Sequence, residues 1–284
     1  MLLSRFRTQT RFVILPPTQT ATISNHFRNI QVDCRRHEDL FAEMQRFRGQ
    51  VYLSDGAVQA GDLIDGRHKV SIDEQSWHVL SLDSSGRICA CLRYLEEHHA
   101  SGFHKLWVRH AALAQAPAFA DRFRQAVEAA MERARRLQIG FGEVGGWAVA
   151  ESHRWTLEPL RIILATYGLL QLRGGCSGVA TATFRHSSAT ILRRIGLDSL
   201  ALEGVALPPY YDPNYGCEME VLAFDSRFPN PKYRDSVNEL SCLLAESPVI
   251  CRENFKSTVP QVVRGFEISA AEATRARTLL PIAI

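Results

Sequence analysis

The order in which strand-like and helix-like segments alternate after residue 76 restricts the fold more than any other feature of this sequence. Residues 76–83 and 87–95 alternate or run apolar and are joined by Ser84-Ser85-Gly86, which predicts a β-hairpin. Six further segments predict, in order, a helix, a strand, a helix, a strand, a helix and a strand: 116–138, 140–149, 156–174, 177–185, 186–197 and 217–225. This order predicts an α/β chain whose mixed central sheet is flanked by helices.

The chain is expected to divide into three parts. Residues 1–35 contain no acidic residue before Asp33 and hold Pro16-Pro17 in a threonine-rich stretch, which predicts a flexible N-terminal arm. Residues 36–251 contain the alternating segments, preceded by a predicted helix over 38–53 and followed by one over 233–247, and are expected to form one domain. Residues 252–284 are expected to form a C-terminal extension with a short helix.

Charge and cysteine content argue against several classes of function. The 33 basic and 30 acidic residues are mixed along the chain, without the basic stripe that favours phosphate binding, so no nucleic-acid partner is expected. The seven cysteines form no C-x-x-C pair, which favours a reducing cytoplasm over a disulfide framework. No apolar run approaches about 18 residues, so no membrane span is expected.

The signatures of common cofactor and catalytic sites are missing. No G-x-G-x-x-G follows a predicted strand, and the P-loop, H-E-x-x-H and G-x-S-x-G patterns do not occur. The histidines between residues 98 and 110 have no standard ligand spacing, so no metal is expected. Cys89 and Cys91 are predicted to share a sheet face with Arg93, where thiols are more often small hydrophobes than nucleophiles.

Glu143 interrupts the apolar, glycine-broken strand 140–149. An ionised carboxylate is costly in such a strand unless it is paired, and burial raises its pKa, which suits a general base. By strand alternation Glu143 shares a face with Gly145 and Trp147, and the glycines allow a bulge or the close approach of a ligand. The alternative is a glutamate at a strand end that faces water.

Arg93 interrupts the apolar strand 87–95 in the same way. Its guanidinium is always charged, so within a strand it needs a carboxylate or phosphate partner. Asp73 and Glu74, which precede the hairpin, are candidate partners. Arg93 therefore either forms a structural ion pair at the sheet edge or binds substrate.

These segments resemble a known fold. The order of elements and the stretch WAVAESHR, residues 147–154, resemble the Gcn5-related N-acetyltransferase (GNAT) fold, in which a strand ending in Val-x-x-x-x-Arg leads into the helix that receives the acyl donor's pyrophosphate. More closely, residues 73–95 together with EVGGWAV resemble the autoinducer-synthase branch of that fold, which comprises acyl-homoserine-lactone synthases and long-chain N-acyl amino acid synthases. The resemblance covers roughly residues 40–225.

The resemblance implies an acyltransferase and names its site residues. The strand glutamate would act as base, and an acyl thioester would lie between strands 140–149 and 177–184, which would splay apart to admit it. Backbone N–H groups of two residues would bind the oxyanion, and an aspartate and two arginines would bind substrate. In this sequence the implied catalytic, oxyanion and substrate-binding residues are Glu143; Trp147 and Ala148; and Asp73, Arg93 and Arg154.

Two departures from the family pattern refine this expectation. Gly146 stands where the lactone synthases generally have an arginine, which argues against lactone chemistry. After Arg154 the sequence lacks the glycine-rich loop whose N–H groups cradle a coenzyme A pyrophosphate. The resemblance then favours an acyl carrier protein as donor, through its phosphopantetheine arm, and an amino acid or similar small amine as acceptor.

Two other functions stay open. One is an acetyl- or acyl-coenzyme A-dependent N-acyltransferase that acts on a small amine. The other is a non-catalytic lipid-binding or sensor protein that keeps the fold, which the glycine at position 146 allows. The apolar helix 157–170 and Phe184 either form a wall for a long acyl chain or belong to an ordinary core.

Overall fold

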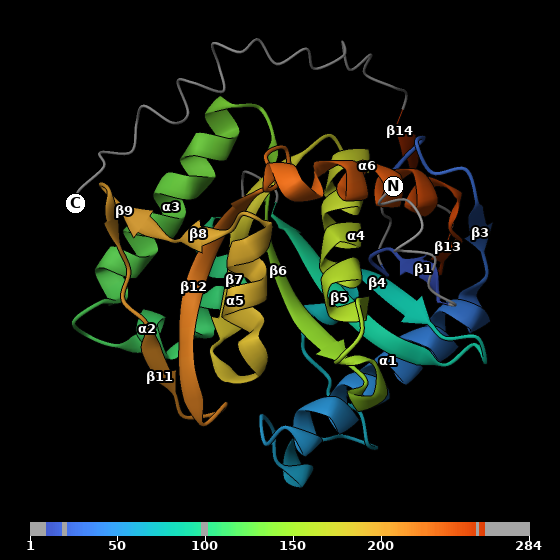
Figure 1. Ribbon diagram of the computed structural model, residues 1–284, viewed down its shortest axis with the longest axis horizontal. Helices are drawn as coiled ribbons and strands as arrows, with labels where there is room; N and C mark the ends of the chain where they lie inside the picture. The colour runs from blue at the N-terminus through green and yellow to red at the C-terminus, as the bar shows by residue number, and fades with distance from the viewer. Residues whose placement is uncertain (1–9, 19–21, 98–101, 254–255, 259–284) are drawn as a thin grey trace.

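A mixed β-sheet forms the central layer of the protein, with helices on both faces (Figure 1). The computed structural model describes residues 10–18, 22–97, 102–253 and 256–258. In these residues the sheet has ten strands in the order β11-β12-β7-β6-β5-β4-β1-β13-β3, with β8 paired to β12 outside this path. The predicted α/β architecture is confirmed.

The predicted strands lie at the centre of this sheet. The predicted hairpin is β4 and β5, and β6 pairs antiparallel with β5 and parallel with β7. Two small sheets pair β2 (Thr22–Ser24) with β14 (Lys256–Thr258) and β9 (Ala201–Leu202) with β10 (Val205–Ala206). The strands of the large sheet are β1 (Arg11–Leu15), β3 (Ile30–Val32), β4 (Trp77–Leu82), β5 (Ile88–Glu97), β6 (Gly140–Val149), β7 (Cys176–Thr183), β8 (Asp198–Ser199), β11 (Tyr210–Asp212), β12 (Cys217–Asp225) and β13 (Val249–Cys251).

The helices predicted from apolar periodicity are present, apart from the C-terminal one over 268–280, which lies outside the described residues. The observed N-cap of α4 is Leu157, one residue after the predicted cap Thr156, whose Oγ1 accepts a hydrogen bond of 3.0 Å from the Glu158 N–H. The α-helices are α1 (Cys34–Ser54), α2 (Ala112–Gln115), α3 (Ala120–Arg136), α4 (Glu158–Leu172), α5 (Ser188–Ile195) and α6 (Arg234–Glu246).

Strand alternation divides the apolar side chains between two faces of the sheet. In β1, Val13 and Leu15 pack with Met44 of α1, while Phe12 and Ile14 pack in the core that contains α4 and α6. A further core lies between α3 and the β6–β7–β12 part of the sheet. The sheet is therefore covered by α1 and α3 on one face and by α4, α5 and α6 on the other (Figure 1).

The prediction that residues 1–35 form a flexible arm is wrong for the described part of that segment. β1 lies inside the sheet, antiparallel to β4 and parallel to β13, and four of its five residues are buried. The reason is the apolar run Phe12–Leu15, whose burial outweighs the turn-forming prolines that follow it. The domain therefore begins by Arg11 rather than near residue 36; residues 1–9 lie outside the described part of the chain.

The C-terminal segment adds a further strand to the sheet beside β1. β13 inserts between β1 and β3, and β14 pairs with β2, so residues from both ends of the chain meet at the same side of the molecule. The predicted boundary at residue 251 falls at the end of β13. Most of the predicted extension, residues 254–255 and 259–284, lies outside the described residues.

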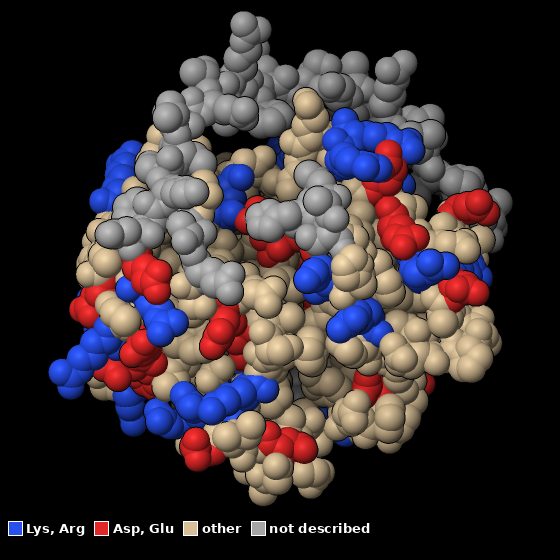
Figure 2. Space-filling view, turned by 180° about the vertical axis from the view of Figure 1, so that it is seen from behind, with Lys and Arg blue, Asp and Glu red and all other residues tan. Residues whose placement is uncertain are grey.

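Basic and acidic side chains are interspersed on the face of the molecule shown in Figure 2. Over the described ranges, no helix combines the length and apolar character needed to cross a membrane. Within the same ranges, no three His, Cys, Asp or Glu side chains are grouped as a metal site. His98 and His99, two of the histidines considered above, lie outside those ranges.

β6 and β7 diverge halfway along their length. Their parallel pairing ends where Val144 lies opposite Ala180, although both strands continue. On its other edge β6 contains a bulge, because Arg93 pairs with Gly145 but Cys91 pairs with Ala148, so that two residues of β6 oppose one of β5. A bulge bends the strand that carries the extra residue. The bend of β6 explains why it leaves β7 at this point.

Candidate active site

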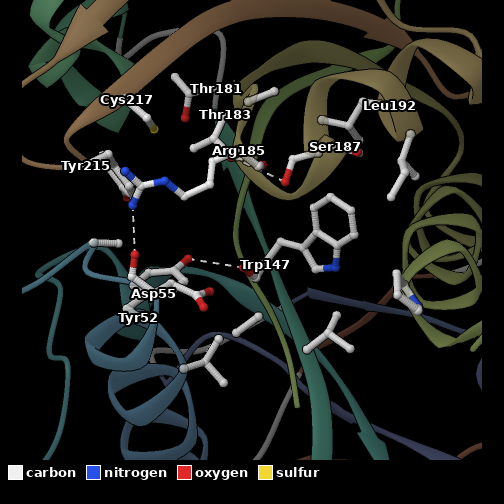
Figure 3. Close-up of a pocket in the computed structure, with 18 of the residues that line it drawn as sticks. Tyr52, Asp55, Trp147, Thr181, Thr183, Arg185, Ser187, Leu192, Tyr215 and Cys217 are labelled. Atoms are coloured by element: carbon white, nitrogen blue, oxygen red, sulfur yellow. Dashed lines mark hydrogen bonds between the residues drawn. The ribbon is translucent and has the colours of Figure 1, made fainter. Parts of the chain in front are cut away.

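A cavity of about 360 Å³ lies where β6 and β7 diverge. The β6 residues after the last β6–β7 pair form one wall, and the end of β7 forms the opposite wall (Figure 3). Helices α1, α4 and α5 and the start of β12 complete the lining. The splayed strands predicted from the family resemblance are therefore present. The side chains labelled in Figure 3 are Tyr52, Asp55, Trp147, Thr181, Thr183, Arg185, Ser187, Leu192, Tyr215 and Cys217.

Two arginines and an aspartate stand at one side of this cavity. Arg154 donates two hydrogen bonds to the Asp55 carboxylate, at 2.8 and 2.9 Å, and a third to the Val149 carbonyl at 3.2 Å. Arg185 reaches from the β7–α5 connection to the Asp55 carbonyl at 2.8 Å (Figure 3). Arg154, which the sequence assigned to substrate binding, thus already has a carboxylate partner that the sequence did not indicate.

Trp147 and Ala148 lie in the β6 wall, as the sequence predicted. The Trp147 indole projects into the cavity, its Nε1 is buried, and the described residues offer that nitrogen no hydrogen-bond partner (Figure 3). Its carbonyl accepts a hydrogen bond of 3.3 Å from the Tyr52 hydroxyl. The Cys91 thiol donates a hydrogen bond of 3.6 Å to the Gly146 carbonyl. Both peptides of the bulge are therefore held in place by neighbouring side chains.

Asp73 forms the centre of a buried ionic group beside the cavity. We call Arg48, Asp73, Arg93 and Glu143 the charged cluster; all four are at most 5% exposed. Arg48 Nη1 and Nη2 donate to the two Asp73 oxygens at 2.9 and 2.5 Å, and Arg93 Nη1 donates to Oδ1 at 3.3 Å. Gln45 adds a bond of 3.0 Å to Oδ2. Both carboxylate oxygens of Asp73 accept hydrogen bonds from protein side chains. Asp73 therefore holds the two arginine side chains in position and does not face the cavity.

Charge pairing sets the pKa of Asp73. Burial by itself raises the pKa of this carboxyl, but the Coulombic attraction and hydrogen bonds of Arg48 outweigh it and hold the pKa well below its ordinary value. Burial lowers the pKa of His78, which contacts the Asp73 carbonyl at 2.9 Å, to about 4. Near neutral pH Asp73 is therefore ionised and the adjacent His78 is neutral.

Glu143 lies in the doubly paired half of β6, opposite Leu95 of β5 and Val179 of β7, and is 3% exposed. The alternative of a water-exposed glutamate is therefore wrong, because β6 has a neighbouring strand on each side at this position. Its Oε2 accepts a hydrogen bond of 2.8 Å from the Val108 N–H of the 3-10 segment η4 (Trp107–His110). Burial raises its pKa, and Arg93 and the η4 N–H groups offset only part of that rise.

The two cysteines considered as nucleophiles do not share a face, contrary to the prediction. The β4–β5 register shifts within the hairpin, which places Cys89 under the influence of Glu158 of α4 and Cys91 under that of Arg48 of α1. Burial raises the pKa of Cys89 to about 11 and that of Cys91 to about 12. Neither thiol is ionised at neutral pH, which argues against a nucleophilic role.

Gly146 departs from the family pattern in a way that the structure explains. Its φ of +63° is left-handed, a conformation that favours glycine. A Cβ at this position would lie 3.2 Å from Arg93 Cβ and 3.3 Å from Arg48 Nη1. The space next to residue 146 is thus already filled by the Arg48 guanidinium, which comes from α1.

The structure sorts the predicted residues into two adjacent groups. Glu143, Arg93 and Asp73 meet in the charged cluster, whereas Trp147, Ala148 and Arg154 belong to the cavity or its mouth. Sequence reasoning missed five residues that complete these groups. Two have the i, i+4 spacing that places side chains on one face of α1, a third follows that helix as its C-cap, and the other two lie in connections after strands. They are Arg48, Tyr52, Asp55, Arg185 and Tyr215.

No family model and no curated protein sequence matches the chain. A structural match is the CoA-dependent acyl-homoserine lactone synthase BjaI with SAM and isopentyl-CoA, at TM-score 0.51 and 14% identity, covering 89% of this chain and 95% of BjaI. The same enzyme with MTA matches at TM-score 0.50 and 15% identity over the same shares. FeeM, an N-acyl amino acid synthase from uncultured soil microbes, aligns at TM-score 0.44 and 8% identity, covering 77% of this chain and 92% of FeeM. The likeness to BjaI shows that the chain has the GNAT-like fold predicted from its sequence.

Proposed function

We propose that this protein is an N-acyltransferase that moves an acyl group from a thioester donor to the amine of an amino acid or similar small amine. The observation that carries the proposal is the cavity between the splayed strands, next to a buried glutamate on the same strand. A cavity lined largely by apolar side chains suits an acyl chain, and a carboxylate of raised pKa suits proton removal from an ammonium.

In the proposed reaction the acyl thioester lies between β6 and β7 and the amine enters from the side of the charged cluster. Glu143, directly or through a water molecule, removes one proton from the ammonium, because only the free amine can attack. The nitrogen then forms a C–N bond to the thioester carbon and the C–S bond breaks. The second proton lost by the nitrogen goes to the departing thiolate, so an amide and a thiol are the products.

We assign stabilisation of the oxyanion to backbone N–H groups near Trp147 and Ala148. Two features support this assignment: β6 has no partner strand on the cavity side here, and the Tyr52 hydroxyl holds the Trp147 peptide. Preorganised N–H donors of this kind contribute a few kcal/mol to the transition state.

We further propose an acyl carrier protein as donor. The first turn of α4 carries Glu158, which pairs with Arg161 at 3.4 Å, and Arg154 is bonded to Asp55. These groups do not make the phosphate-binding helix start that a coenzyme A pyrophosphate needs. A phosphopantetheine arm carries one phosphate, for which Arg185 at the mouth supplies the positive charge, since its hydrogen bonds go to the Asp55 and Gly216 backbone carbonyls. Acyl-coenzyme A is the competing choice, because BjaI is a CoA-dependent enzyme.

Mass spectrometry of the products tests this function. The full-length protein is incubated with long-chain acyl carrier protein, palmitoyl-coenzyme A or acetyl-coenzyme A, each with the twenty proteinogenic amino acids. A new N-acyl amino acid formed from the carrier protein alone is the expected result. Product from coenzyme A donors alone overturns the donor assignment, and no product from any donor overturns the enzymatic function in favour of a sensor that keeps the fold.

A further inference from the structure

Gly145 is the first residue of β6 beyond the last β6–β7 pair, and it lines the cavity. It lies opposite Arg93 in the β5–β6 register. A Cβ built on Gly145 would lie 3.3 Å from Arg93 Nη2 and 4.0 Å from Glu143 Oε1. One point on the cavity wall is therefore close to both a guanidinium and a carboxylate of the charged cluster.

Both groups have hydrogen-bonding capacity that the described residues leave unused. Arg93 Nη1 donates to Asp73, but its buried Nε has no partner among them, and its Nη2 has no recorded hydrogen bond there. Glu143 Oε2 accepts the Val108 N–H and the Trp107 N–H also bonds to this carboxylate, whose two oxygens can accept further hydrogen bonds. A buried charged group with unused donors or acceptors is costly, so a ligand that satisfies both groups gains binding energy.

We infer that Gly145 determines which acceptors the protein takes, because its missing side chain opens the space in which one small ligand reaches Arg93 and Glu143 together. The inference rests on the proposed function. Nη2 and Oε1 lie near the same point, so they fit an acceptor whose carboxylate and amine are on the same or adjacent carbon atoms. The carboxylate bonds to Arg93 while the amine faces Glu143.

The substitution Gly145→Ala tests this inference with little risk to the fold. Gly145 is not among the glycines with left-handed φ, and the atom that its Cβ would approach at 3.3 Å is a side-chain nitrogen of Arg93 rather than backbone. We expect the KM for the amino-acid acceptor to rise at least tenfold while the KM for the acyl donor changes less than twofold. Gly61→Ala is the matched control, since no atom lies within 4 Å of its added Cβ.

A pair of acceptors separates a subsite from a general loss of activity. Phenylalanine and phenethylamine differ only in the carboxylate, so the wild type should prefer phenylalanine and Gly145→Ala should reduce that preference. An unchanged KM for the amino acid, or equal losses for both acceptors, overturns the inference.

Isothermal titration calorimetry with each amino acid keeps the test independent of turnover. We expect Gly145→Ala to weaken binding of the best amino-acid ligand at least tenfold relative to Gly61→Ala. If the wild type binds no amino acid, or Gly145→Ala binds one as the wild type does, the inference is wrong. Absence of product from every donor, with amino-acid binding still lost in Gly145→Ala, overturns the proposed function alone.

Discussion

The charged cluster and the cavity beside it lie against the two halves of one strand, β6, and they differ in what their side chains can do. Glu143 lies in the half of β6 that pairs on both edges, and the cluster around it is buried. Gly145–Val149, in the other half, pair only with β5 and border an open space. A strand bonded on both sides fixes side chains, whereas a strand bonded on one side exposes backbone N–H and C=O groups to a ligand.

The difference shows how one strand supplies both fixed charges and room for a substrate. Arg48 and Asp73 hold Arg93 in position before any ligand binds, so little reorganisation is needed during the reaction. The cavity has its charged groups at the mouth, in Arg154, Asp55 and Arg185. Changes on the two sides should therefore have different consequences, for stability in the cluster and for substrate binding in the cavity.

Asp73→Asn should have the largest effect, because it leaves two buried arginines without a counter-charge. We expect the free energy of unfolding to fall by about 3–5 kcal/mol, as measured by urea denaturation at pH 7. Folding lowers the pKa of Asp73, so its contribution is present at neutral pH and is lost as the pH falls below about 4.

The pH dependence of Asp73→Asn is the sharper readout. The variant should lose less stability than the wild type as the solution is acidified through this range. Asp121→Asn, on the exposed surface of α3, is the control and should change stability by less than about 0.5 kcal/mol. Equal free energies of unfolding for Asp73→Asn and Asp121→Asn would show that the stability of the protein does not depend on the Asp73 carboxylate.

Glu143→Gln should abolish catalysis and preserve the fold. Loss of a general base lowers kcat by about 10²–10⁴-fold. Burial raises the pKa of Glu143, so folding favours its protonated form and a neutral glutamine should not reduce the free energy of unfolding at pH 7.

A profile of kcat against pH identifies the role of Glu143. The base acts only when deprotonated, so wild-type kcat should rise with pH through a pKa above the ordinary value for glutamate. This rise should be missing in Glu143→Gln. A variant with near-normal kcat at all pH values would exclude Glu143 as the base.

Gly178→Ala should destabilise the closed half of the β6–β7 pair. A Cβ on Gly178 would overlap the Gly142 carbonyl oxygen. β6 and β7 would therefore have to move apart at the Gly142–Gly178 pair, within the part of the two strands that is now hydrogen-bonded. We expect a loss of about 3 kcal/mol in the free energy of unfolding. Gly61→Ala again serves as control, and equal midpoints for the two variants would contradict the close packing of β6 on β7.

Trp155→Ala should have the smallest effect. Trp155 borders the cavity mouth and is 97% exposed, so its removal should change stability by less than about 0.5 kcal/mol. If the donor arm passes this side chain, the KM for the acyl donor should rise a few-fold and kcat should stay constant. An unchanged KM for carrier-protein and coenzyme A donors would place the donor entrance elsewhere.

Some features of the site could be read from the sequence because they depend on local pattern. Glu143 and Arg93 are charges inside apolar strands, and such charges require buried partners wherever the strand goes. Asp73 could be named because it immediately precedes the hairpin that contains Arg93. Arg48 and Arg185 gave no such signal, since an arginine in an amphipathic helix or a loop is ordinary in sequence.

The error at the N-terminus has a related cause. The sequence of residues 10–18 contains a strand-like run next to prolines, and its propensity does not distinguish a disordered arm from an inner strand. The pairing of β1 with β4 and β13 settles the matter, and those partners lie more than sixty and more than two hundred residues away along the chain. A short stretch of sequence contains no information about partners so far away along the chain.

By itself the sequence determined the order of strands and helices, the hairpin and the charges that had to be buried, because periodicity and the cost of an unpaired charge act locally. The tertiary structure decided three further features: β1 belongs to the sheet, Asp73 faces two arginines, and a bulge at Gly146 turns β6 away from β7. Each of these depends on which distant segments pack together, and that choice is made by the whole core.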